Sequence, residues 1–83
     1  MEIPVTFYSY FKEITGVDQA VVSLEDGATI GDLQSAICSQ YPKMEAMRQS
    51  TLIAVGVEYQ DRNYVLQPGD EVSFFPPVQG GSQ

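Results

Sequence analysis

The residues of this sequence with the clearest chemical potential are two adjacent glycines near its C-terminus, Gly80 and Gly81. Pro76-Pro77 precede them, and because neither proline can donate a sheet hydrogen bond, both favour an extended exit from a preceding strand. Glycines lack side chains and could enter a channel too narrow for other residues. Such a segment suits a protein whose own main-chain carboxyl must reach another enzyme's active site. If the glycine pair is considered alone, the simpler explanation is an ordinary frayed C-terminus without a function.

The remaining side chains offer little catalytic chemistry. The sequence contains no histidine, which excludes histidine-based acid–base catalysis, a Cys/His nucleophilic pair and histidine metal ligation. The single cysteine, Cys38, is expected on the flank of a helix rather than in a redox site. The acidic pairs Glu25-Asp26 and Asp70-Glu71 fall in turns, where such neighbours are usually solvated. We therefore expect no metal site, no bound cofactor and no self-contained enzyme.

Length and charge narrow the class of partner. The chain has 83 residues, which is enough for one domain, and a net charge of −7. Its four basic residues form no cluster, so nucleic acid and anionic membranes are poor targets. The acidity suits a partner protein with a basic surface, although it could equally serve solubility alone. One cysteine and no visible secretory signal predict a cytoplasmic protein.

Hydrophobic periodicity predicts strands and one main helix. Alternation or apolar runs predict strands over residues 3–8, 19–24, 52–57 and 71–75, with a tight turn at 67–70. Apolar residues spaced for one helical face predict a helix from Ile30 to Tyr41, begun by Thr29 as N-cap and stopped by Pro42. Residues 11–16 are expected to form a loop or short turn. Residues 43–51 are expected to be irregular, with a short helical turn around residues 44–47. Residues 59–63 are expected to form a turn between short strands.

This order of elements predicts an α+β fold with a mixed sheet of about five strands and one main helix on one face. A strand pair followed by a helical crossover, with both termini feeding central strands, is the ubiquitin-like β-grasp pattern. We expect the domain to occupy residues 1–76 and a flexible tail to occupy residues 77–83. Strand alternation further predicts that Val72 and Phe74 point into the core while Ser73 and Phe75 point outward.

The C-terminal segment, residues 66–81, reads LQPGDEVSFFPPVQGG. It closely resembles the C-terminus of the molybdopterin synthase small subunit, the MoaD family, whose hallmarks are Gly-Asp-Glu-Val, then Phe-Pro-Pro-Val, then Gly-Gly. The first strand, residues 13–16 and the helix led by Thr29 extend the resemblance over nearly the whole chain. Thiamine sulfur carriers of the ThiS type share the fold and the Gly-Gly but generally lack the Phe-Pro-Pro stretch, so they rank second.

The resemblance implies a sulfur carrier that is not itself an enzyme. In the family, a ubiquitin-activating-type enzyme adenylates the terminal glycine carboxylate with ATP, and sulfur from a donor then replaces the adenylate to give a thiocarboxylate. The tail next enters the large subunit of molybdopterin synthase and donates sulfur to a pterin precursor in molybdenum cofactor biosynthesis. By this resemblance, Gly81 would carry the sulfur and Gly80 would give it passage, while the partner enzymes supply the catalytic groups.

A partner-binding surface is expected on the sheet face opposite the helix. Alternation places Tyr8 and Phe75 there, with Tyr59 expected beside them, and exposed aromatic side chains are typical of interface hot spots. The resemblance adds the segment 76–78, which consists of Pro76, Pro77 and Val78. The alternative is a scatter of surface aromatics without a common function.

Ser82-Gln83 depart from the family pattern, in which the second glycine is the C-terminus. A peptide bond to Ser82 blocks the Gly81 carboxyl. Either a peptidase removes the two residues, or they are foreign to the natural protein, or the chain has another role. One such role is a trimmed sulfur carrier for thiamine, cysteine or another metabolite. Another is a ubiquitin-like modifier that becomes attached to lysines.

Overall fold

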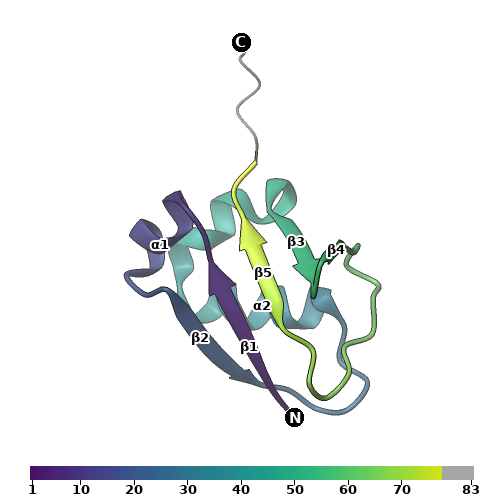
Figure 1. The fold of residues 1–83 in the computed structure, drawn as a ribbon. Coiled ribbons are helices and arrows are strands. Elements are labelled where there is room, and N and C mark those ends of the chain that lie inside the picture. The colour runs from purple at the N-terminus through teal and green to yellow at the C-terminus, as the bar shows by residue number, and fades with distance from the viewer. Residues whose placement is uncertain (78–83) are drawn as a thin grey trace.

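The computed structural model describes residues 1–77 (Figure 1). Along the chain the elements are β1 (Glu2–Phe7), α1 (Tyr10–Thr15), β2 (Gln19–Ser23), α2 (Ile30–Gln40), the 3₁₀ helix η1 (Pro42–Ser50), β3 (Leu52–Val55), β4 (Glu58–Tyr59) and β5 (Val72–Phe75). Within these residues the strands form one five-stranded sheet in the order β2-β1-β5-β3-β4. β1 and β5 pair in parallel and the other neighbours are antiparallel, so the expected mixed α+β sheet is confirmed.

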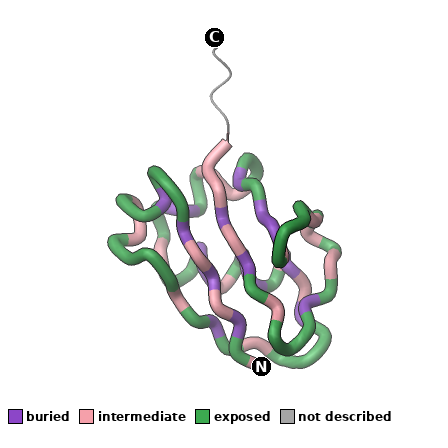
Figure 2. The backbone as a smooth tube through the Cα atoms, in the orientation of Figure 1, coloured by how far each residue is buried: buried purple, intermediate pink, exposed green. Residues whose placement is uncertain are grey.

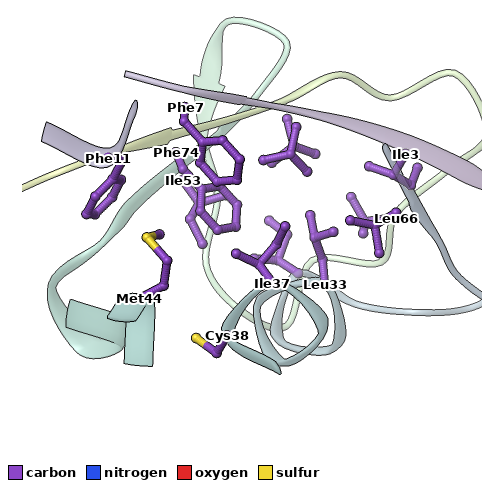
Figure 3. Close-up of a cluster of buried hydrophobic side chains, with 14 residues drawn as sticks. Ile3, Phe7, Phe11, Leu33, Ile37, Cys38, Met44, Ile53, Leu66 and Phe74 are labelled. Atoms are coloured by element: carbon purple, nitrogen blue, oxygen red, sulfur yellow. The ribbon is translucent and has the colours of Figure 1, made fainter. Parts of the chain in front are cut away.

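The core lies between this sheet and α2. Buried positions alternate with more exposed ones along β1 and β5, as Figure 2 shows. Val72 and Phe74 are buried whereas Ser73 and Phe75 are half-buried, which confirms the predicted alternation. Figure 3 shows the inward side chains meeting those of α2. The core cluster consists of Ile3, Val5, Phe7, Phe11, Val22, Ile30, Leu33, Ile37, Cys38, Met44, Ile53, Leu66, Val72 and Phe74.

The main helix begins where the sequence predicts and ends one residue earlier than expected. Thr29 is the N-cap: its Oγ1 accepts from the Asp32 backbone N–H at 3.2 Å, and the Asp32 carboxylate accepts from the Thr29 N–H at 2.9 Å. This reciprocal capping box satisfies two N–H groups that the first helical turn leaves unpaired. The helix ends at Gln40, and Tyr41 is its C-cap because Pro42 cannot continue the helical ladder.

Residues 10–15 form a helix, so the prediction of a loop or short turn over residues 11–16 was wrong. The signal lay in the three-residue spacing of Phe11, which is buried, and Ile14, which packs against the core. Gly16 ends the helix with φ 78° and donates its N–H to the Lys12 carbonyl at 2.8 Å. Its left-handed conformation is the usual helix C-terminal signal.

The segment after α2 is more regular than predicted. A 3₁₀ helix, η1, spans Pro42–Ser50, whereas the sequence indicated only a short turn around residues 44–47. Met44 carries the buried face of η1 and packs beside Phe11 (Figure 3). The next strand, β3, ends at Val55, two residues earlier than expected, because Gly56 turns the chain with φ 60° into β4.

The tight turn before β5 lies at residues 67–70, as predicted, and the Asp70 side chain stabilises it with hydrogen bonds. Asp70 donates its backbone N–H to the Gln67 carbonyl at 3.0 Å, and Gly69 adopts φ 92° between them. The Asp70 carboxylate accepts from the Gln67 N–H at 2.8 Å and from the Tyr64 hydroxyl at 3.3 Å. These bonds direct the chain from the turn into the central strand β5.

A buried polar network joins α2, η1 and the loop after β4. Gln34 is only 2% exposed, and its amide donates to the Arg48 carbonyl at 2.8 Å while accepting from Arg62 Nε at 3.0 Å. The Arg62 guanidinium also donates to the carbonyls of Arg48 at 2.6 Å and Thr51 at 3.3 Å. Since buried polar groups are costly unless paired, these bonds specify how the three segments pack.

We expect Thr29→Ala to lower the free energy of unfolding by about 1 kcal/mol, because the capping box loses its side-chain acceptor. Chemical denaturation measures this loss. Ser39→Ala, at an exposed position inside the same helix, is the matched control and should change stability by less than about 0.5 kcal/mol. Equal effects of the two substitutions would contradict the capping role.

Candidate functional site

Among residues 1–77, no helix covers the second face of the sheet. In the view of Figure 1, α2 lies behind the sheet and the strands are open to the viewer. Within residues 1–77 the outward side chains of this face therefore meet solvent rather than a second layer. β5 runs up the middle of the sheet and leads into Pro76-Pro77, so this face borders the start of the C-terminal tail.

Three aromatic rings gather where β5 ends. Tyr8 and Phe75 stack with ring centroids 4.6 Å apart and planes inclined by 13°. Tyr59 meets Phe75 edge-on, with ring centroids 6.2 Å apart. Tyr8 is 39% exposed and Tyr59 is 68% exposed, so the rings contact one another without being buried. The expected grouping of these three residues on the outer face is confirmed.

Cross-strand register explains the grouping and adds a fourth residue. Tyr8 follows β1 and donates its backbone N–H to the Phe74 carbonyl at 3.2 Å, which brings it beside Phe75. On the other side of β5, Leu52 is the register partner of Phe75 and is 38% exposed. We call Tyr8, Leu52, Tyr59 and Phe75 the aromatic patch. Leu52 was not singled out from the sequence, although inward Ile53 implies that its neighbour points outward.

A shallow groove of about 380 Å³ adjoins the patch between β3 and β4. Leu52 and Tyr59 of the patch line this groove, and Arg62 lines it as well. Aromatic and aliphatic surface beside a groove is the kind of site that receives an apolar side chain from a partner protein. A second hollow, lined by residues 23–28 and Asp32, lies at the start of α2 and does not touch the patch.

The other predicted site residues differ in how far the structure describes them. Pro76 and Pro77 are half-buried at the end of β5, next to Phe75 in the chain. Val78, Gly80 and Gly81 lie outside the described residues, so their predicted roles in partner binding and sulfur transfer stay predictions. The patch and the proline pair thus come together at the point where the described chain ends.

Cys38 lies on the flank of α2, as predicted, and is buried there. It lies to one side of the apolar stripe of α2, and because η1 packs against that side, the residue is only 7% exposed. Burial raises the pKa of the Cys38 thiol, the Glu45 carboxylate raises the pKa further, and the Arg48 guanidinium opposes the rise. A neutral buried thiol is a poor nucleophile and a poor metal ligand.

The described part of the chain shows neither a metal cluster nor a membrane span. In residues 1–77, no three or more histidine, cysteine, aspartate or glutamate side chains are grouped so that they could hold a metal ion. No helix in the same residues has the length and apolar character to cross a bilayer. Among these residues, the patch is therefore the strongest candidate for a functional surface.

Comparison with known proteins gives a consistent result. The model of the ThiS family matches residues 5–81. The molybdopterin synthase sulfur carrier subunit of Chlamydomonas reinhardtii is 33% identical over 84 aligned residues, which cover 98% of this chain and all of the relative. The match therefore spans both the sheet that carries the patch and the segment that contains Gly80 and Gly81.

Solved structures agree with the sequence comparison. A Pyrococcus furiosus protein provisionally identified as molybdopterin converting factor subunit 1 superposes with a TM-score of 0.85 at 28% identity, covering 94% of this chain and 99% of that one. A Helicobacter pylori chain from a complex of subunits 1 and 2 of molybdopterin-converting factor superposes with a TM-score of 0.70 at 27% identity, covering 98% and 100%. The fold is the ubiquitin-like β-grasp that the order of elements predicted.

The environment of Cys38 predicts low thiol reactivity. At pH 8 we expect a disulfide reagent to modify the folded protein at least roughly tenfold more slowly than the denatured protein, since the thiolate is both scarce and shielded. Because the folded pKa is raised, the stability that depends on the neutral thiol is fully present below the unfolded pKa of about 8.5 and is lost as the pH rises through the folded value. Equal reaction rates in the two states would contradict this.

Proposed function

The chain belongs to the ThiS family, and on this premise we propose that it is a sulfur carrier which delivers sulfur from Gly81 in molybdenum cofactor biosynthesis. The relative from Chlamydomonas reinhardtii is a sulfur carrier subunit of molybdopterin synthase. In this chain, the same role would require a docking surface and a reactive C-terminus. The observation that carries the proposal is the partly exposed Tyr8–Phe75 stack at the end of the strand that leads to Gly80-Gly81.

The proposed chemistry takes place on the main-chain carboxyl of Gly81. A carboxylate is a poor electrophile, so an adenylating enzyme of the ubiquitin-activating type first joins it to AMP from ATP and releases pyrophosphate. A sulfur donor then displaces AMP and leaves a thiocarboxylate, which is a strong nucleophile at neutral pH. Transfer of that sulfur to an acceptor and hydrolysis of the acyl group regenerate the carboxylate. This chain supplies no side chain to these steps.

The aromatic patch is the proposed docking surface for the partner enzymes. Its rings are partly exposed, and burial of Tyr and neighbouring apolar groups at the centre of an interface is a common source of binding energy. The same surface is next to Pro76-Pro77, which favour an extended path toward Gly80-Gly81. A partner that covers the patch could therefore receive the tail. The proposed partners are the large subunit of molybdopterin synthase and the adenylating enzyme.

Ser82-Gln83 have to be removed before Gly81 can react, because its carboxyl is held in a peptide bond. We include a peptidase among the proposed partners for this reason. The alternative acceptors, in thiamine, cysteine or other metabolite synthesis, would use the same trimmed carrier with a different partner. A ubiquitin-like modifier would use the same activated Gly81 but transfer the acyl group to a lysine.

The intact mass of the protein recovered from its own cells tests the sulfur chemistry. We expect a chain that has lost Ser82-Gln83 and in which one oxygen is replaced by sulfur. Remnants of this chain linked to lysines of other proteins would support the modifier role instead. A full-length chain that the host's adenylating enzyme does not activate would overturn the proposal.

We expect Phe75→Glu to weaken binding to the large subunit by at least about 30-fold, equivalent to about 2 kcal/mol, because a carboxylate would be placed at the centre of the patch. Calorimetric titration gives the affinity, and circular dichroism checks that the fold persists. Val21→Glu adds the same charge at a 59% exposed position on β2 and is the matched control. Unchanged affinity of Phe75→Glu would exclude the patch as the interface.

A further inference from the structure

The link between β1 and α1 contains an unusual backbone conformation. Ser9 has φ 53° and ψ −128°, and it is the one non-glycine residue within the described range with a positive φ. The Phe11 N–H donates to the Tyr8 carbonyl at 3.0 Å, which closes a four-residue turn with Ser9 in its second position. These angles are those of a type II′ turn, in which this position is normally glycine because L side chains are strained there.

Ser9 does not act as an ordinary helix cap. It occupies the N-cap position of α1, where serine is frequent because its hydroxyl usually accepts a bond from the first turn. Such caps have extended backbone angles, however, and the Ser9 side chain makes no capping hydrogen bond. The α1 helix therefore gains no hydrogen bond from the serine hydroxyl that would offset the strained backbone.

The residues on both sides of the turn are held in fixed positions. Phe7 ends β1 with 1% exposure, and Phe11 is fully buried only four residues later, so both are anchored in the core. Between them, Tyr8 is tied to β5 by its hydrogen bond to the Phe74 carbonyl at 3.2 Å. Since α1 begins at Tyr10, Ser9 is the one residue between Tyr8 and the start of the helix.

We propose that the positive φ of Ser9 is a positioning device that holds the Tyr8 ring on Phe75 and so preforms the aromatic patch. A residue unable to adopt this conformation would have to release either the Phe11 anchor or the Tyr8 bond to β5. The buried Phe11 is the costlier to move, so Tyr8 is the group that shifts. This inference rests on the proposed function, in which a partner protein binds the patch. A preformed surface loses less conformational entropy on binding, so fixing the Tyr8 ring in advance would strengthen that interaction.

The test uses chirality to separate backbone conformation from side-chain identity. The 83-residue chain is made by chemical synthesis with Ser9→Val as L-valine or as D-valine, and Ser9→Gly is made as well. A β-branched L residue strongly disfavours positive φ, whereas its D form favours it and glycine permits it. The two valine chains have the same composition, so a difference between them reports on the turn.

The first measurement is the set of aromatic proton shifts of Tyr8 and Phe75, which their stacked rings displace in the wild type. We expect the L-valine chain to lose these ring-current shifts and to bind the large subunit at least tenfold more weakly. The D-valine and glycine chains should keep both the shifts and the wild-type affinity. The D-valine chain should also melt several degrees above the wild type, because the strain is removed.

Each outcome decides the proposal. Wild-type shifts in the L-valine chain, or lost shifts in the D-valine and glycine chains, would overturn it. If the L-valine chain does not fold, the test rests on the D-valine chain. Preserved ring-current shifts with a higher melting temperature would then support the proposal. A melting temperature at or below that of the wild type would overturn it. If the shifts follow the prediction while the wild type binds no partner, the proposed function fails and the positioning role of Ser9 stands.

Discussion

The parallel pairing of β1 with β5 is the contact on which the rest of the molecule depends. It joins the first strand to the last described strand through the register Val5–Val72, Thr6–Ser73 and Phe7–Phe74. On its inner side the Phe7 and Phe74 rings meet edge-to-face with centroids 5.9 Å apart, at the centre of the core. Side chains alternate along a strand, so burying Phe74 places Phe75 on the opposite face. Core packing and the position of the aromatic patch are therefore set by one pairing.

The layers of the fold explain why such a patch stays accessible. α2 covers one face of the sheet, and its capping box and the Gln34–Arg62 network hold that layer in place. The other face has no covering layer within residues 1–77, so apolar side chains there contact only one another and solvent. The Tyr8–Phe75 stack reduces this exposure without removing it. A stable one-sided fold can thus present an apolar surface without giving up its own core.

Local patterns were enough to predict most of the elements but not their contacts. Alternation and helical spacing predicted the strands and α2, because burial of one face imposes those periods. The six residues of α1 are too few for a clear period, and η1 follows a 3₁₀ path that the α-helical period does not describe. Leu52 joined the patch through its register with Phe75, and Cys38 became buried through contact with η1. The placement of Leu52 and the burial of Cys38 both depend on contacts between segments that are distant in the sequence. The conformation of Ser9 and the hydrogen-bond network around Arg62 likewise have no local sequence signal.

The chain has few side chains that could take part in catalysis, and this is consistent with the proposed carrier role. The sequence contains no histidine, and its one cysteine is buried with a raised pKa, which makes that thiol a poor sulfur nucleophile. The main-chain carboxyl of a terminal glycine needs no neighbouring side chain, provided that another enzyme activates it. The demands on the fold then reduce to a recognisable surface and a narrow extended segment leading away from it. Placing β5 in the middle of the sheet meets both demands together, because the strand that contributes Phe75 to the patch continues directly into Pro76-Pro77.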